Sequence, residues 1–195
     1  NPIVAINENG VASMTLTFDD PGTLDAHTVE VDWGDGTVET LNVTAGARTF
    51  SATHQYLDDN PTATSSDVYA VNVKVRDDDG GQATASSTVE VLNVAPGNVV
   101  AAPVGSIINE GGGVTLDVTF DDPGSQDTHQ VEITWGDGHV TTGTATGHTF
   151  NASHVYADNG VYMIRVGATD NNGSYATAGP TVTVSSLDTY PLAWT

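Results

Sequence analysis

Residues 17–38 read TFDDPGTLDAHTVEVDWGDGTV, and residues 119–140 read TFDDPGSQDTHQVEITWGDGHV. Fifteen of these 22 positions are identical at a constant offset of 102, whereas chance would give about one or two for this composition. The match continues on both sides, with an offset that falls to 100 and then to 93. The chain is therefore two copies of one domain.

The two copies define the expected domain boundaries. We expect the first repeat over residues 1–92 and the second over residues 93–186, each large enough to bury its own core. Residues 187–195, which include Trp194, have no counterpart in the first repeat and are expected to be a C-terminal tail or the start of a further segment. The last fall in the offset is an insertion in the first repeat, within residues 57–67.

Alternation of apolar and polar residues at period two predicts short strands in both copies. The rows expected to point inward in the first copy are Met14, Leu16, Phe18; Val29, Val31, Trp33; and Tyr69, Val71, Val73, Val75. The corresponding rows in the second copy are Leu116, Val118, Phe120; Val131, Ile133, Trp135; and Tyr162, Ile164, Val166. About seven strands per copy, separated by Gly, Asp and Pro turns, predict an all-β chain of two immunoglobulin-like β-sandwich domains in tandem.

The charge of the chain is strongly negative. It carries 25 acidic and 4 basic side chains, for a formal net charge of -21. Nucleic acid is therefore not an expected partner, because phosphate binding needs Lys and Arg, and an anionic membrane surface is not expected for the same reason. One explanation is that the acids form a solvated, repulsive coat, as on a protein adapted to high salt. The other is that some of them bind cations, and calcium is the first candidate because all the available ligand atoms are oxygens.

Three absences also bear on the class of protein. The sequence has no cysteine, which excludes disulfides and thiolate zinc sites. No run of 18 apolar residues exists, so no direct membrane insertion is expected. No signal peptide is visible, and the chain opens at Asn1-Pro2-Ile3-Val4 as a fragment of a larger protein would.

A set of motifs occurs twice and in the same order. Trp-Gly-Asp-Gly at 33–36 and 135–138 is followed by His-x-Tyr at 54–56 and 154–156, and then by a strand that runs into Asp77-Asp78-Asp79-Gly80-Gly81 or Asp170-Asn171-Asn172-Gly173. This order resembles the polycystic kidney disease (PKD) domain, and the Asp-Asp-Pro-Gly and Asp-x-His elements look like a bacterial subtype from repeat-bearing surface proteins. The resemblance implies an immunoglobulin-like fold, an extracellular setting and a role in adhesion, spacing or accessory binding. Some bacterial members of the family bind calcium at one pole of the sandwich.

The aromatic and histidine motifs are expected to be structural. Trp33 and Trp135 are in register with inward rows, and Asp35 and Asp137 can cap the turns that follow them. The two His-x-Tyr pairs are expected to form hydrogen-bonded corners of the tyrosine-corner kind. His27 and His129 follow an Asp by two residues, so they are either polar loop residues or transition-metal ligands.

The acidic loops are the candidate metal sites. In this topology the second strand ends at Asp19-Asp20-Pro21-Gly22, and the loop between the sixth and seventh strands lies at the same pole. Carboxylates gathered there would repel one another unless a cation lay among them, and calcium accepts six to eight oxygens in irregular geometry. The expected calcium ligands of the first repeat are Asp19, Asp20, Asp25, Asp77 and Asp79.

The second repeat offers a similar set. Its expected ligands are Asp121, Asp122, Asp127 and Asp170, with Asn93 as a carbonyl or amide donor. We expect calcium at this pole to stiffen the junction between the two domains. The alternative for both repeats is an acidic rim held by Asx-type hydrogen bonds without an ion.

The sequence is compatible with two classes of function and argues against a third. The favoured one is a non-catalytic spacer or adhesion module of a larger secreted or cell-surface protein, whose partners are the flanking domains of its own chain and a cell-surface or matrix protein or polysaccharide. The alternative is an accessory polymer-binding module, for carbohydrate or protein, of a secreted hydrolase, which would need exposed aromatic side chains. An enzyme is not expected, because no nucleophile turn or phosphate loop appears and nothing desolvates the paired carboxylates.

Overall fold

The computed structural model describes residues 2–60, 62–173 and 175–186. The chain divides into two compact units, the first comprising Asn1–Val94 with Gly124–Gln126 and the second Ala95–Pro123 with Asp127–Thr195. The expected tail at 187–195, with Trp194, lies outside the described residues. In the described part of the chain, no helix is long and apolar enough to cross a membrane.

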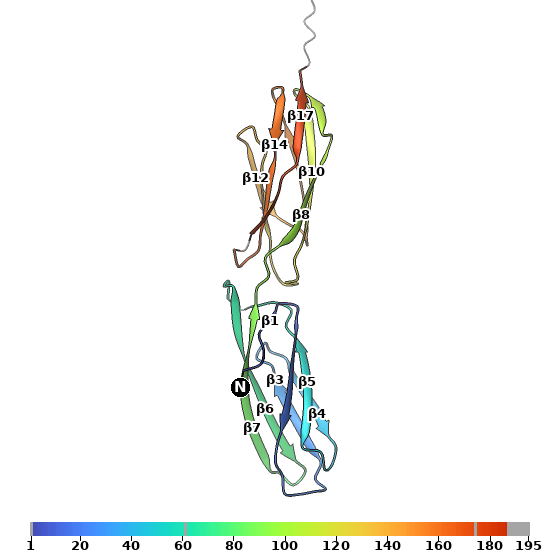
Figure 1. Ribbon diagram of the computed structural model, residues 1–195, viewed down its shortest axis with the longest axis vertical. Helices are drawn as coiled ribbons and strands as arrows, with labels where there is room; N and C mark the ends of the chain where they lie inside the picture. Colours follow the sequence, from blue (N-terminus) through green and yellow to red (C-terminus); the bar gives the residue numbers. More distant parts are fainter. Residues whose placement is uncertain (1, 61, 174, 187–195) are drawn as a thin grey trace, which may run out of the picture. The chain divides into compact units, whose positions relative to one another are not determined.

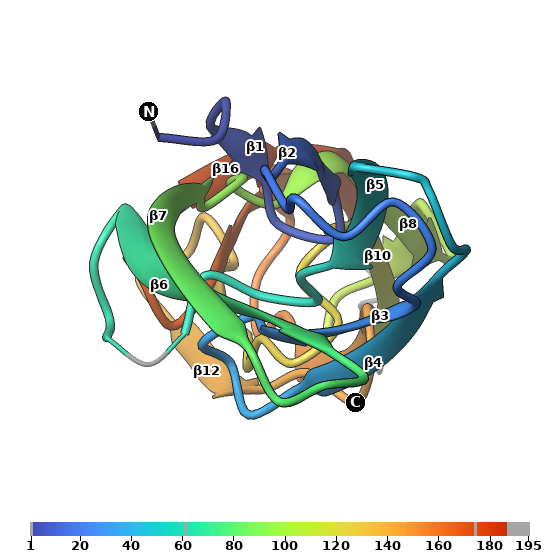
Figure 2. The same cartoon turned by 90° about the horizontal axis from the view of Figure 1, so that it is seen from below.

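The first unit is a sandwich of two sheets (Figure 1). Its strands are β1 (Ile6–Asn7), β2 (Val11–Thr17), β3 (His27–Asp32), β4 (Val38–Val43), β5 (Thr49–Gln55), β6 (Ser66–Asp77) and β7 (Gln82–Leu92). One sheet has the order β1-β7-β6-β3-β4, and the other pairs β2 with β5. Figure 2 looks along these strands, with β2 and β5 on one side of the interior and β6 and β3 on the other. All pairs are antiparallel except β1 with β7, which is parallel.

The core of the first unit follows from the alternation in its sequence. Val29, Val31 and Trp33 are 0% exposed, while the intervening Thr28 and Glu30 face solvent. Val71 and Val73 on β6 are buried against them. Because side chains alternate between the two faces of a strand, each row contributes to one continuous core between the sheets.

The second unit has the same sandwich architecture with more, shorter strands. They are β8 (Gly97–Val104), β9 (Ile107–Asn109), β10 (Gly113–Asp121), β11 (Gln130–Thr134), β12 (Val140–Thr144), β13 (Thr149–Val155), β14 (Gly160–Met163), β15 (Arg165–Thr169), β16 (Tyr175–Ala178) and β17 (Thr181–Ser185). They pair in the orders β13-β10-β8, β12-β11-β15-β16 and β14-β17-β9. The predicted all-β, immunoglobulin-like architecture is thus confirmed in both units.

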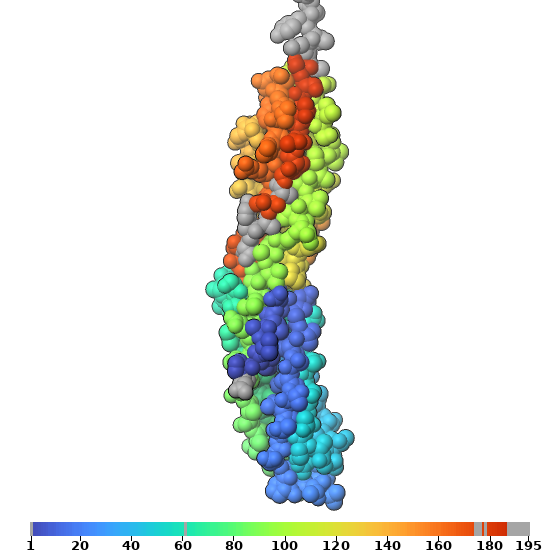
Figure 3. All heavy atoms as spheres, in the orientation of Figure 1, coloured from blue at the N-terminus to red at the C-terminus, as the bar shows by residue number. Residues whose placement is uncertain are grey.

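Two long strands of the first unit are interrupted in the second. Strands β14 and β15 together correspond to β6, and β16 and β17 together correspond to β7. The break lies at Ile164, whose amide donates to Pro180 O at 3.0 Å, and at Gly179-Pro180. Proline has no N–H to give to a ladder, so pairing on that side must stop there. Beyond the break, β14 and β17 run side by side on the surface (Figure 3).

Strand β8 has no counterpart among the described residues of the first unit. It pairs antiparallel with β10, and its Val99 and Ala101 pack on the core. Leu116 and Val118 on β10 are consequently 0% and 1% exposed, whereas Leu16 on β2 is only partly buried. The two repeats therefore differ in how well this sheet is covered.

Candidate functional site: the acidic poles and the His–Asp turns

Three carboxylates meet at one pole of the first unit. Asp20 follows β2, Asp25 precedes β3, and Asp77 ends β6. His27 lies directly opposite Asp77 in the register of β3 and β6, which brings the two loops together. One ligand atom from each of the three aspartates lies within 4.8 Å of the others. The structure thus gathers Asp20, Asp25 and Asp77 as the topology argument expected.

Asp20 is held by neutral and basic partners. Its Oδ1 accepts a hydrogen bond from Gly22 N at 2.8 Å, and its Oδ2 lies 2.6 Å from His27 Nε2 and 3.9 Å from the Arg48 guanidinium. The Gly22 hydrogen bond, followed by that from His27, lowers the pKa of Asp20. This carboxylate is therefore ionised and oriented toward the pole.

Asp25 has the opposite electrostatic environment. Desolvation raises its pKa first, and the negative charges of Asp20, Asp78, Asp79 and Asp77 raise it further. Like charges at short range disfavour the ionised form of each carboxyl group unless a cation compensates them. Asp25 is thus the carboxyl group of this pole whose ionisation is opposed by its acidic neighbours.

Asp77 organises the turn between β6 and β7. Its Oδ1 accepts hydrogen bonds from Asp79 N at 3.1 Å and Gly81 N at 2.6 Å. These are the Asx-type bonds of the ion-free alternative. The side chains of Asp19 and Asp79, both expected to be ligands, are exposed and do not belong to the close group.

The second unit has a more buried version of this pole. Asp122, Asp127 and His129 form a close group within 4.8 Å, and Asp122 Oδ2 lies 3.0 Å from His129 Nε2. Asp170 is 5% exposed, and its Oδ1 accepts a hydrogen bond from Asn172 N at 3.0 Å. Thr128 N donates to Asn171 Oδ1 at 3.3 Å, so the loop that begins at Asp170 touches the loop that carries Asp127.

Two expected ligands of the second unit lie elsewhere. Asp121 is exposed, and its Oδ2 accepts a hydrogen bond from Asn98 Nδ2 at 2.9 Å. Asn93 belongs to the first unit, where its backbone amide donates to Ser65 O at 3.2 Å. The close group of the second unit is therefore smaller than expected and contains a histidine.

The two histidines at the poles lie in different local structures. His27 opens β3 and is not a loop residue, whereas His129 lies in the loop before β11 as expected; both side chains are buried, 4% and 3% exposed. Each is paired with the aspartate seven residues before it, His27 with Asp20 and His129 with Asp122. Strand alternation contains the signal that could have found them, since position 27 is in phase with Val29 and Val31.

The Trp-Gly-Asp-Gly turns lie at the other end of the strands. Gly34 has φ of +84°, and a Cβ there would lie 2.6 Å from Ala70 O, so both the backbone conformation and the space require glycine. Asp35 Oδ1 accepts a hydrogen bond from Thr37 N at 2.9 Å, which confirms the expected cap. Trp33 is fully buried and Tyr56 Oη donates to Trp33 O at 2.7 Å, which confirms the core tryptophan and the tyrosine corner.

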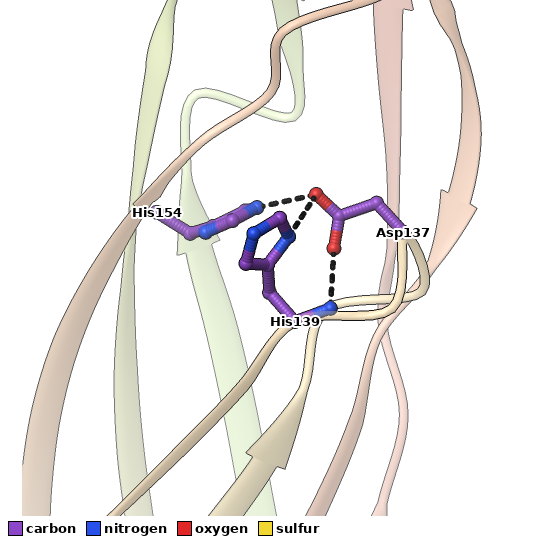
Figure 4. A group of neighbouring side chains, drawn as sticks. All are labelled: Asp137, His139 and His154. Atoms are coloured by element: carbon purple, nitrogen blue, oxygen red, sulfur yellow. Dashed lines mark hydrogen bonds and ion pairs between the residues drawn. The ribbon is translucent and has the colours of Figure 1, made fainter.

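The same turn in the second unit carries an additional imidazole. Asp137 Oδ2 lies 2.6 Å from His154 Nε2 and 3.2 Å from His139 Nδ1, while its Oδ1 accepts from His139 N at 3.0 Å (Figure 4). Burial opposes ionisation of Asp137, but the hydrogen bonds from His154 and from the His139 amide outweigh it and lower its pKa to about 2. In the first unit Thr37 takes the place of His139.

Comparison with known proteins assigns the second unit. The sequence profile of the PKD domain matches residues 93–184. Residues 93–184 form a PKD domain. This match agrees with the motifs of the second repeat, and PKD domains are non-catalytic modules found in extracellular or surface proteins.

Solved structures of several proteins are similar to the chain at low identity. The PKD domain of an M14-like peptidase from Thermoplasmatales archaeon SCGC AB-540-F20 is 22% identical, covers 48% of this chain and 98% of its own, and has a TM-score of 0.42. The PKD domain of the human VPS10 domain-containing receptor SorCS2 is also 22% identical, with 50% and 80% coverage and a TM-score of 0.40. The fibronectin(III)-like modules of Clostridium thermocellum CbhA are 16% identical, with 100% and 95% coverage and a TM-score of 0.40. A search of curated proteins found no match.

Proposed function

We propose that the chain is a tandem of two PKD domains that serves as a non-catalytic spacer or adhesion module of a secreted or cell-surface protein, and that calcium binds the acidic pole of each unit. The observation that carries the calcium proposal is the group of Asp20, Asp25 and Asp77, in which the pKa of Asp25 is raised by desolvation and by four neighbouring carboxylates. A calcium ion would remove this repulsion and would accept the irregular oxygen geometry of three loops.

The tandem assignment of the first unit rests on its repeat identity with the PKD domain. Both units have a buried tryptophan before the turn, an aspartate cap and a tyrosine corner. The occurrence of Asp-Asp-Pro-Gly and Asp-x-His in both repeats favours the bacterial surface-protein subtype.

The alternative of an accessory polymer-binding module is less favoured. Such a module stacks sugar rings on exposed aromatic side chains. Among the aromatic side chains that the structure describes, every Trp, Tyr and Phe is buried or partly buried. A cosedimentation assay with insoluble polysaccharides would reveal such binding, and retention of the chain in the pellet would favour this alternative.

A thermal melt in EDTA and in millimolar calcium tests the calcium proposal, with magnesium and sodium chloride as controls. A ligand that binds only the native state raises the melting temperature, so we expect a rise that is specific to calcium. An equal response to all salts would instead mean charge screening of an acidic coat, and the calcium proposal would be lost.

The variant Asp25→Asn should change the melting temperature in opposite directions without and with calcium. Removal of a repelled carboxylate should raise the melting temperature in EDTA, and loss of a ligand should lower the additional rise that calcium produces. Glu30→Gln is the matched control, because Glu30 is exposed on β3 outside the group and loses the same charge. If the two variants respond to calcium alike, Asp25 is not a ligand.

A further inference from the structure

A second type of polar cluster lies at the end of the second unit opposite its acidic pole. His139, His154 and Asp137 each present one ligand atom within 4.8 Å of the others. Figure 4 shows both imidazole rings directed at the same carboxylate, which projects from the turn that Asp137 caps. The cluster differs from the acidic poles because two of its three donors are nitrogens.

The fold holds two members of the cluster in place independently of any ligand. The ring of His154 is stacked on buried Trp135 at 5.0 Å and 20°, and it meets Tyr156 edge-on at 4.7 Å. Tyr156 is fixed in turn by its hydrogen bond to Trp135 O at 2.9 Å. The Asp137 side chain is fixed by the His139 amide. Such support from neighbouring residues orients ligands before a metal arrives.

The third member gives access from solvent. The His139 side chain is 73% exposed, against 13% for His154 and 15% for Asp137. Zinc bonds of about 2.0–2.1 Å place the ligands of a tetrahedral ion about 3.3 Å apart. Asp137 Oδ2 already lies 3.2 Å from His139 Nδ1 and 2.6 Å from His154 Nε2. The His139–Asp137 separation thus already suits a tetrahedral ion, and to admit one Asp137 Oδ2 and His154 Nε2 must move apart from 2.6 Å to about 3.3 Å.

We propose that the second unit binds one transition-metal ion of the zinc class through His139 Nδ1, His154 Nε2 and the Asp137 carboxylate, with water in the remaining position. Imidazole nitrogen selects zinc, copper and nickel over calcium, which takes oxygen ligands. On binding, each imidazole adopts the tautomer that carries its proton on the other ring nitrogen. The ion replaces the two N–H donors that share Asp137 Oδ2 when no metal is bound.

The first unit is an internal control for this site. Asp35 and His54 repeat the pair at 2.7 Å, and His54 is stacked on Trp33 at 5.2 Å and 21°. Position 37 is threonine, however, so the first unit lacks the third donor. One substitution in each unit therefore exchanges the two environments.

Titration of the intact chain with zinc chloride by calorimetry tests the proposal, in millimolar calcium, which competes for the carboxylate oxygens of the acidic poles. The wild-type chain should bind one zinc ion, His139→Thr none, Thr37→His two, and the double variant one. Changes outside the ligand shell already weaken metal sites about 10–100-fold, so loss of the His139 ligand should exceed about tenfold.

Circular dichroism checks that each variant is folded, so that a loss of zinc binding can be assigned to the missing ligand. His139→Thr installs the residue with which the first unit folds, so its spectrum and melting temperature without zinc should match those of the wild type. Zinc binding that is as tight in folded His139→Thr as in the wild type would overturn the proposal. The same conclusion follows if folded Thr37→His binds no additional ion, or if the wild-type chain binds none.

Discussion

Asp35 and Asp137 occupy equivalent turns, and in each unit this one carboxylate both caps the turn and accepts a hydrogen bond from a histidine. Each accepts the amide of the residue two positions later and the Nε2 proton of the histidine on the facing strand. Burial raises the pKa of both, but these hydrogen bonds prevail, so the pKa of Asp35 is lowered and that of Asp137 falls to about 2. Both carboxylates stay ionised in the folded protein.

The depressed pKa of Asp137 predicts a loss of stability in acid. Because the folded value of about 2 lies below the ordinary 3.8, the contribution of this carboxylate is present above pH 3.8 and is lost as the pH falls toward 2. In Asp137→Asn the second unit should lack this part of the pH dependence. Urea unfolding of wild type and variant at a series of pH values measures it, and their difference in stability should shrink between about pH 4 and pH 2.

Glu132→Gln is the control for that series. Glu132 is an exposed carboxylate on β11 in the same unit, and its removal changes the net charge equally. A pH profile of Asp137→Asn that follows that of Glu132→Gln would contradict the role assigned to the turn.

Single residues also show what the sequence could predict. The burial of Trp33 and Trp135 follows from alternation, and the tyrosine corner follows from the His-x-Tyr spacing after it. The pairing of His27 with Asp20 was missed, because the partner lies across a loop whose path no periodicity describes. The His139 donor was missed for a similar reason: it is exposed and has no counterpart in the first repeat.

At the level of elements, β8 is the largest difference between the two units. It closes one side of β10 and buries Leu116 and Val118, whereas the corresponding sheet of the first unit has only β2 and β5. Comparison of the repeats predicted the strands that occur in both copies. It could not predict β8, nor the break at Pro180, because each is present in one copy only.

Two lysine substitutions on β8 test its contribution. Ala101 is partly buried against the core and Ala102 is exposed next to it. Ala101→Lys should lower the free energy of unfolding of the second unit by about 1–3 kcal/mol, because a charge is placed on an apolar surface. Ala102→Lys adds the same charge opposite Asp117 and should be within about 0.5 kcal/mol of wild type. Urea unfolding followed by circular dichroism gives both values, and equal losses would mean that β8 does not cover the core.

For the molecule as a whole, the dominant property is a net charge of -21 on 195 residues. A net charge this far from zero opposes association between molecules and destabilises each compact unit through self-repulsion. The topology argument predicted which loops would gather the aspartates, but the sequence could not separate their roles, since Asx bonds and ion ligation use the same carboxylates. In the structure Asp77 makes such bonds and also belongs to the close group.

Calcium should act on the molecule as well as on its parts. We propose that calcium bound at the acidic pole of the second unit orders the loops there and so restricts the relative motion of the two units. Small-angle scattering in EDTA and in calcium, at matched ionic strength, measures the distribution of interatomic distances. Identical curves for the two forms, in a sample whose melting temperature responds to calcium, would show that the ion stabilises each unit without stiffening the chain.

The parallel pairs at the edge of each unit have a mechanical consequence. Strand β1 lies parallel to β7, and β9 lies parallel to β17, so an early strand and the last strand of each unit are hydrogen-bonded neighbours. Tension applied through the two ends of a unit would pull these neighbours in opposite directions along their length. The hydrogen bonds between them, such as Glu8 N to Leu92 O and Glu110 N to Ser185 O, would then be loaded together in shear and not opened one after another. The first unit, whose parallel pair joins its first and last strands, therefore resists stretching at the place where force enters it.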